Sequence, residues 1–138
     1  MKQFFGMSQS GNLAEAVSGL HSPQFIMLLS NASQFAEHVS ALEKRYPGVP
    51  SIGCIGMSYQ TRVVERGVGV IAFYDGVQAA SNVLEQVSAM PVKYIARLEE
   101  DVRKVGGSGR DTVCIDFCAG NDACGLTTIY TALRQQGI

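Results

Sequence analysis

A glycine- and cysteine-rich stretch, DFCAGNDACGLTT at residues 116–128, carries the residue types best suited to chemistry in this chain. Gly120 and Gly125 have the spacing of the two glycines in a phosphate-binding loop. That loop needs a lysine to reach the terminal phosphates, and Leu126 stands in the lysine position here. Asp122 also places a negative charge inside the loop. The pattern therefore disfavours nucleotide hydrolysis. It is typical of a tight turn from a strand into a helix, in which glycine residues allow the necessary backbone conformations.

Three of the cysteines, Cys114, Cys118 and Cys124, lie in or next to this stretch. Cys114 and Cys118 point to one face of a predicted strand but lie about 13 Å apart along it, so they do not share one metal ion. The double pair of closely spaced cysteines that is typical of a structural zinc site does not occur. We therefore predict small buried thiols and no metal site. A redox-active Cys118 or Cys124 at a helix N-terminus remains an alternative.

The other candidate groups form no recognisable enzyme site. The only histidines are His21 and His38, and His38 borders an apolar helical stripe, which favours a half-buried or surface position. A single histidine can also be the proximal ligand of a haem, so this alternative stays open. The acidic residues 99–101 lie among basic ones, as on a solvated helix face. Because no nucleophile motif occurs in its usual context, we predict no catalytic residues and no enzyme.

The composition indicates one globular domain. The chain has 138 residues, 46% of them hydrophobic, with 11 basic and 12 acidic side chains and a net charge of −1. The absence of a basic block excludes the electrostatic footprint of a nucleic-acid-binding protein. The N-terminal residues lack the apolar core of a signal peptide, and no window is long and apolar enough for a membrane span. We expect a cytoplasmic protein with reduced cysteines.

Periodicity in the first half predicts alternating helices and strands. A helix over 12–20 follows Asn12 as its cap, with Glu15 completing a capping-box pattern, and a buried strand covers 24–30. A second helix, 32–46, is capped by Asn31, and a strand over 51–59 contains several glycines. The strand at 63–74 follows too closely for a parallel crossover, so we predict an antiparallel hairpin between these two strands.

The second half predicts helices over 77–90, 92–105 and 125–137, with a flexible connector at 106–109 and a strand over 111–118. Strands alternating with helices indicate an α/β fold. We predict a mixed, mostly parallel sheet with helices packed on its faces, in a single layered domain over 1–138. Ligands of such sheets bind beyond the carboxyl ends of parallel strands, which here are residues 30–33, 56–59 and the opening stretch.

The order of these segments resembles the N-terminal part of the FIST domain, a bacterial intracellular sensory module. The resemblance runs from NLAEAV to RQQG, and the segments that carry it are QFIMLLS, PSIGCIGMSY, GVGVIAF and VCIDFCAGNDACG. In the family, the Gly-Cys pair is commonly followed by Ser or Thr, a small residue, Gly and Glu. Here the pair Gly53 and Cys54 is followed by the sequence IGMS, so this motif departs from the family pattern.

The resemblance implies a non-enzymatic domain that binds small ligands, usually amino acids, and is linked to an output such as a histidine kinase or a cyclic-dinucleotide enzyme. Some members bind haem and respond to nitric oxide, so a haem-based sensor is the second hypothesis, and a thiol-dependent redox protein is the third. The family domain usually continues beyond the last helix seen here. The resemblance therefore implies that a C-terminal half is missing. A sheet edge that this truncation leaves open on the chain would pair across a homodimer.

An amino-acid ligand needs donors for its carboxylate and acceptors for its ammonium. We expect the backbone N–H groups of residues 120–125 to bind the carboxylate and Asp122 to receive the ammonium. The other expected ligand-binding residues lie at the predicted strand ends and in the glycine-rich turn: Asn31, Ser33, Cys54, Gly56, Ser58, Tyr59, Gly120, Asn121 and Gly125.

Overall fold

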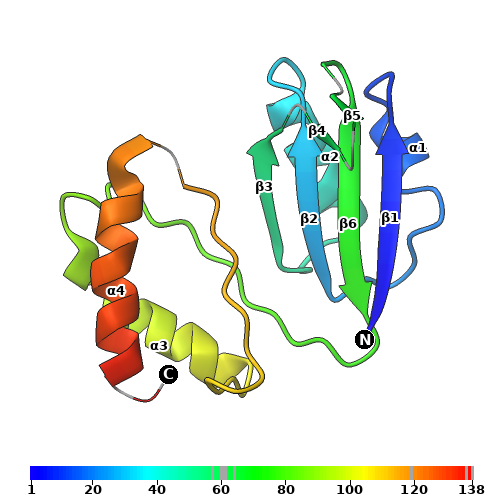
Figure 1. Ribbon diagram of the computed structural model, residues 1–138. Coiled ribbons are helices and arrows are strands. Elements are labelled where there is room, and N and C mark those ends of the chain that lie inside the picture. Colours follow the sequence, from blue (N-terminus) through cyan, green and yellow to red (C-terminus); the bar gives the residue numbers. More distant parts are fainter. Residues whose placement is uncertain (57, 60–61, 64, 119, 136, 138) are drawn as a thin grey trace. The chain divides into compact units, whose positions relative to one another are not determined.

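Figure 1 shows the computed structural model of the chain, which describes residues 1–56, 58–59, 62–63, 65–118, 120–135 and 137. The length predicted a single layered domain. The chain divides into two compact units, Met1–Ala79 and Ala80–Ile138, and the single domain stays a prediction.

The first unit is built on a four-stranded mixed sheet in the order β1-β6-β2-β3. Its strands are β1 (Lys2–Ser8), β2 (Phe25–Ser30), β3 (Ser51–Ile55) and β6 (Val68–Tyr74). β2 and β3 are parallel, whereas β6 is antiparallel to both β1 and β2. The prediction of a mixed α/β fold is confirmed, but the prediction of a mostly parallel sheet is wrong. The reason is that β1 was not predicted, and β6 inserts between β1 and β2.

The predicted antiparallel hairpin between residues 51–59 and 63–74 is present only at its tip, where Ser58 pairs with Val63, and its longer part is wrong. β3 ends at Ile55, and β6 lies beside β2 instead of β3. This central position buries Val68, Val70 and Ala72 of β6 almost completely, whereas a strand at the sheet edge would leave more of its apolar surface in water. The reversal itself is made by a short antiparallel pair, β4 (Ser58–Tyr59) and β5 (Arg62–Val63).

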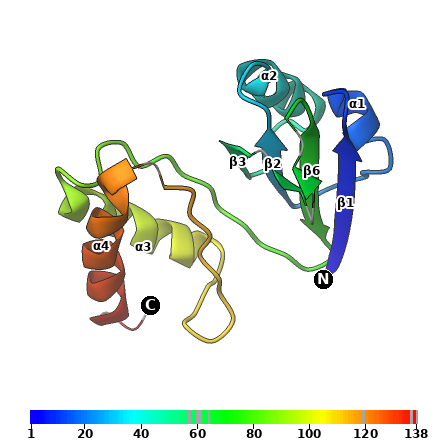
Figure 2. The same ribbon diagram turned by 45° about the horizontal axis from the view of Figure 1, so that its top comes forward.

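Two helices, α1 (Leu13–Ala16) and α2 (Phe35–Arg45), pack on one face of this sheet (Figure 2). The predicted apolar stripe of α2 is confirmed, since its side chains join the core of the first unit: Phe35, Val39, Leu42 and Tyr46. On the sheet, the core residues alternate with residues that point to the opposite face, among them Phe5, Met27 and Ile71. Phe5 is 54% exposed, so this second face is apolar and partly open to water.

The second unit packs α3 (Ile95–Lys104) against α4 (Ala123–Gln135), with short 3-10 turns η1 (Pro91–Tyr94) and η2 (Gly120–Asp122) leading into them. Its core is made of Val87, Tyr94, Ile129 and Leu133. The predicted helices at 92–105 and 125–137 are confirmed, although α3 begins later because Pro91 opens a 3-10 turn.

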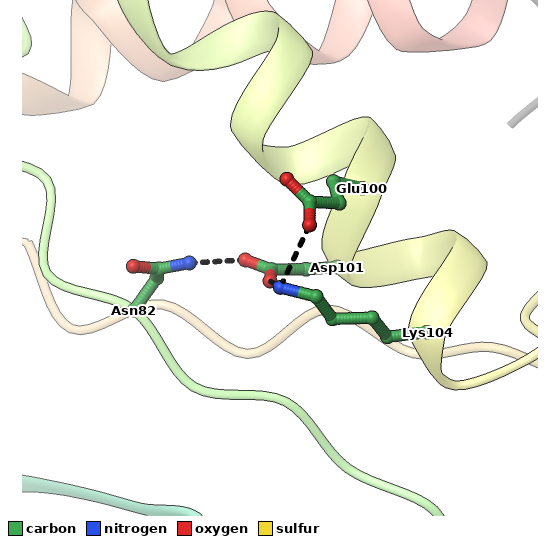
Figure 3. A network of polar contacts seen from close by, with 4 residues as sticks. All are labelled: Asn82, Glu100, Asp101 and Lys104. Carbon is green, nitrogen blue, oxygen red and sulfur yellow. Dashed lines mark hydrogen bonds and ion pairs between the residues drawn. The ribbon is translucent and has the colours of Figure 1, made fainter.

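Two predictions in this unit are wrong. Residues 77–90 form no helix, and the positive φ of 54° at Gln86 lies outside the helical region. Within this segment the Asn82 side chain donates a hydrogen bond to Asp101 on α3 (Figure 3). Residues 112–118 are extended but join no sheet of the described residues. Their β-branched and apolar composition favours an extended chain, but a strand also needs a neighbour for its backbone groups.

Candidate functional site

The carboxyl ends of β1, β2 and β3 meet at one edge of the sheet, because these three strands run in the same direction. Ser8 ends β1 and Ser30 ends β2, and both lie opposite Val68 of β6. Both serines are buried, and their hydroxyls begin a network of polar contacts that reaches into α1 and α2. We call this network the polar edge, made of Ser8, Gly11, Glu15, Ser30, Asn31, Ser33, Gln34 and His38.

His38 is the buried centre of the polar edge. Its Nε2 lies 2.8 Å from the carbonyl oxygen of Gly11, which only accepts, so Nε2 carries a proton. Its Nδ1 lies 2.7 Å from the Ser30 hydroxyl, which also lies 3.0 Å from the Asn31 carbonyl oxygen. A neutral imidazole therefore accepts the Ser30 proton at Nδ1. An imidazolium would donate from Nδ1, and the Ser30 hydroxyl would then donate to Asn31 instead.

The prediction of a half-buried or surface His38 is wrong, because the side chain is only 3% exposed. The apolar spacing of α2 placed His38 beside the stripe, but it did not reveal that Ser30 and Gly11 satisfy both ring nitrogens. In this arrangement neither nitrogen is free to bind the iron of a haem. The haem hypothesis therefore gains no support from His38.

Asn31 holds the loop between β2 and α2. Its Nδ2 group lies 3.1 Å from both Gln34 Oε1 and the Arg66 carbonyl, and 3.3 Å from the Gly67 carbonyl. Its Oδ1 accepts from the Ser33 hydroxyl at 2.7 Å and from the Gln34 N–H at 3.0 Å. Asn31 thus contacts Gln34, but the prediction that it caps α2 is wrong, because α2 begins at Phe35 with Gln34 as its N-cap. These contacts commit the polar atoms of Asn31 to bonds inside the protein.

Ser33 is an exposed member of the polar edge, as is Glu15. Its hydroxyl donates its proton to Asn31, and the oxygen keeps lone pairs that are able to accept a further hydrogen bond. Asn31 and Ser33 therefore lie together at a strand end, as expected. Asn31 makes hydrogen bonds within the protein, and Ser33 is exposed to solvent.

Ser8 and Glu15 form a part of the polar edge that the sequence did not predict. The Ser8 hydroxyl donates to Glu15 Oε2 at 2.7 Å and accepts from the Asn12 N–H at 3.1 Å. Asn12 caps α1 as predicted, but the Glu15 carboxylate bonds Ser8 rather than completing a capping box. Phe4, Gly6 and Ser8 lie on one face of β1, with the period of two that is typical of a strand. Recognition of this strand in the sequence would have predicted the position of Ser8 in the polar edge.

Gly11 shows how tightly the loops of the polar edge approach one another. It has a positive φ of 81°, and a Cβ atom added to it would lie 2.4 Å from Gln34 Oε1. Any side chain here would push Gln34 away and disturb the contact between Asn31 and Gln34.

The predicted ligand-binding residues on and next to β3 and β4 contribute less to the candidate site than those of the polar edge. Cys54 is half-buried on β3, and burial raises the pKa of its thiol. The Gly56 N–H donates to the Ser30 carbonyl at 3.0 Å, and a Cβ atom there would make only ordinary contacts with Leu29. Gly56 therefore extends the pairing of β3 with β2 and does not form a cradle. Ser58 and Tyr59 form β4, and their side chains lie outside the described part of the structure.

The remaining predicted residues lie in the second unit. Asp122 Oδ1 accepts from the Ser88 N–H at 3.1 Å, so this carboxylate caps a neighbouring loop. Gly120 has a positive φ of 57° and lies in η2 with Asn121, whose side chain lies outside the described residues. Gly125 is buried in α4, where a Cβ atom would lie 2.6 Å from the Val87 carbonyl oxygen. Gly125 therefore permits close packing of α4 against residue 87.

The prediction of buried thiols in a core strand is wrong for Cys114 and Cys118, which are exposed because residues 112–118 join no sheet of the described residues. Cys124 is also exposed, at the start of α4. The Cys114 sulfur lies 3.5 Å from the Tyr130 hydroxyl and 3.7 Å from Asp116 Oδ1. Desolvation of this sulfur raises the pKa of Cys114, so the thiol is not activated as a nucleophile. The same desolvation and the Asp116 carboxylate raise the pKa of Tyr130.

Within the described residues, no three His, Cys, Asp or Glu side chains gather closely enough to hold a metal ion. None of the described helices has the length and apolar character needed to cross a membrane. Searches against protein-family models, curated proteins and solved structures found no match to this chain. The resemblance to the FIST domain thus rests on the order of the sequence motifs alone.

Proposed function

We propose that this chain is a small-ligand-binding sensory domain of bacterial signal transduction, with amino acids or similar small metabolites as its ligands. The observation that carries the proposal is the meeting of three parallel strand ends at the polar edge. Ligands of α/β sheets bind at such edges, because loops there present backbone and side-chain polar groups on a rigid base.

The polar edge supplies the chemistry that such a ligand needs. Ser33 offers an exposed hydroxyl oxygen that is able to accept a hydrogen bond from a ligand ammonium. The partly open sheet face, with Met27, Leu29 and Ile71, is apolar and half-exposed. Small-molecule sites combine a mostly apolar wall with a few fixed polar groups. On this sheet the apolar residues lie on the face opposite the helices, and the polar groups lie at the strand ends.

Thermal-shift measurements with each of the common amino acids test this function, followed by calorimetric titration of any that stabilise the protein. A ligand at a hundred times its Kd stabilises the folded state by about 2.7 kcal/mol, which is easily detected. Ser33→Ala should weaken binding by about tenfold or more, since a hydrogen bond to a charged group contributes roughly 1.5–3 kcal/mol. Ser40→Ala, an exposed serine on α2, is the matched control and should bind normally.

If no amino acid stabilises the protein, the proposed ligand class is wrong. If binding occurs but Ser33→Ala and Ser40→Ala behave alike, the ligand binds elsewhere than at the polar edge. Addition of haem, followed by absorption spectroscopy, tests the second hypothesis separately, and the absence of a Soret band would exclude it.

A further inference from the structure

In the second unit, residues 112–118 (TVCIDFC) form an apolar segment that belongs to no helix and to no sheet of the described residues (Figure 1). Val113 is 82% exposed, Ile115 42% and Phe117 41%. An exposed run of β-branched and aromatic residues that joins no sheet is a template for pairing with another strand.

The segment has the side-chain alternation of a strand. Cys114 and Asp116 both contact the Tyr130 hydroxyl on α4. The odd-numbered residues Val113, Ile115 and Phe117 are the exposed large hydrophobic ones. One face of the segment is therefore anchored to α4, and the other presents three apolar side chains, as expected for a period of two.

The sequence of the segment is complementary to itself in one antiparallel register. With Ile115 opposite its own copy, Val113 faces Phe117 and all three apolar residues of one strand meet apolar residues of the other. Asp116, the only charged residue among 112–118, then faces Cys114. A shift of the register by one residue on each strand places Asp116 opposite Asp116, and like charges directly opposite one another are destabilising. Charge and apolarity thus select the same register.

We propose that residues 112–118 pair antiparallel with the same segment of a second copy of this chain, about a two-fold axis at Ile115. Such a contact is isologous and closes on itself, so it produces a dimer and not a fibre. Two short strands bury less surface than a standard stable interface, so the dimer dissociates reversibly on dilution. This proposal goes beyond the proposed ligand binding and does not depend on it.

Sedimentation velocity over a dilution series of the whole chain tests the proposal. We expect a reversible monomer–dimer equilibrium. Ile115→Lys places two like charges opposite each other at the two-fold axis, and it should raise the dissociation constant at least tenfold. Val83→Lys is the matched control, because Val83 is also an exposed hydrophobic residue of this unit, at 73%, and lies outside the segment. Circular dichroism of each variant checks that it is folded.

A mixture of two charge variants makes the test specific. Ile115→Glu alone should also weaken the dimer, whereas an equimolar mixture of Ile115→Lys and Ile115→Glu should associate again, because the central pair is then of opposite charge. A protein that stays monomeric at every concentration overturns the proposal, and so does a dimer that Ile115→Lys leaves intact. A monomer whose 112–118 amides nevertheless exchange slowly would also overturn it, since the strand would then pair with something other than a second copy.

Discussion

At the scale of single residues, the polar edge is held by buried groups whose hydrogen bonds are all made. His38 connects the end of β2 to the loop before α1 through Ser30 and Gly11. Among the described residues, no buried side-chain nitrogen or oxygen lacks a partner. Because an unsatisfied buried polar group costs more than a hydrogen bond contributes, the loss of one member of such a network is expensive.

Replacement of His38 tests the strength of this network. His38→Leu leaves the Ser30 hydroxyl with one partner fewer and the Gly11 carbonyl without the imidazole. We expect the free energy of unfolding in urea to fall by about 1–3 kcal/mol. His21→Leu, at an exposed position, is the matched control and should change it by less than about 0.5 kcal/mol. Equal effects of the two substitutions would contradict the satisfied network.

The proton position on His38 is a second prediction at this scale. Since Nε2 donates to the Gly11 carbonyl, the neutral ring should be the Nε2–H tautomer. Nitrogen-15 chemical shifts of the ring, recorded above neutral pH, distinguish the two tautomers directly. In Ser30→Ala the Nδ1 atom loses its donor, so its shift should move while the Nε2–H tautomer persists. An Nδ1–H tautomer in the natural protein would contradict the arrangement.

The turn that follows α3 provides a prediction on pH. The Asp111 carboxylate accepts from both the hydroxyl and the N–H of Ser108, at 2.7 and 3.0 Å, and these bonds lower the pKa of Asp111. The folded turn therefore prefers the ionised form. The hydrogen bonds to the Asp111 carboxylate are fully present above pH 3.8, the ordinary pKa of aspartate. They are lost as pH falls through the lower pKa that Asp111 has in the folded protein. The amide shift of Ser108 should follow this titration, and Asp111→Asn should abolish it.

At the scale of elements, helix propensity and packing favour different residues at position 125 of α4. Alanine is favoured over glycine in a helix by about 1 kcal/mol. A Cβ atom here would nevertheless lie 2.6 Å from the Val87 carbonyl oxygen, too close for any real contact. Packing against residue 87 thus decides which residue this position accepts.

We expect Gly125→Ala to destabilise the second unit by about 1–3 kcal/mol, because overpacking costs more than the gain in propensity. Thr128→Ala, at an exposed position of the same helix, should be neutral or stabilising. Thermal unfolding followed by circular dichroism measures both. If Gly125→Ala stabilised the protein, α4 and Val87 would have to lie further apart than they do in this structure.

At the scale of the whole molecule, the chain passes from one compact unit to the other at residues 79–80. The residues on either side form neither helix nor strand, and Asp75 and Gly76 have positive φ values of 62° and 85°. We expect limited digestion with a protease of broad specificity to cut first between residues 78 and 83, giving two fragments identifiable by mass spectrometry. A first cut within β6 or α4 would contradict this division.

The sequence by itself determined the local features. The apolar run of β2, the stripe of α2, the amphipathic α3 and the cap at Asn12 follow from spacing and side-chain chemistry within a few residues, and each was predicted. The glycines near residue 120 correctly marked a turn into α4. These features depend on interactions between residues close in sequence, which a periodic pattern records.

Only the tertiary structure decided how those pieces combine. β6 lies between β1 and β2 because its buried side chains gain more there than at an edge, and no local pattern states which strands become neighbours. His38 is buried because Ser30 and Gly11, distant in sequence, satisfy its ring. Residues 112–118 have the composition of a strand and remain unpaired within the described chain, since strand formation requires a partner as well as a propensity.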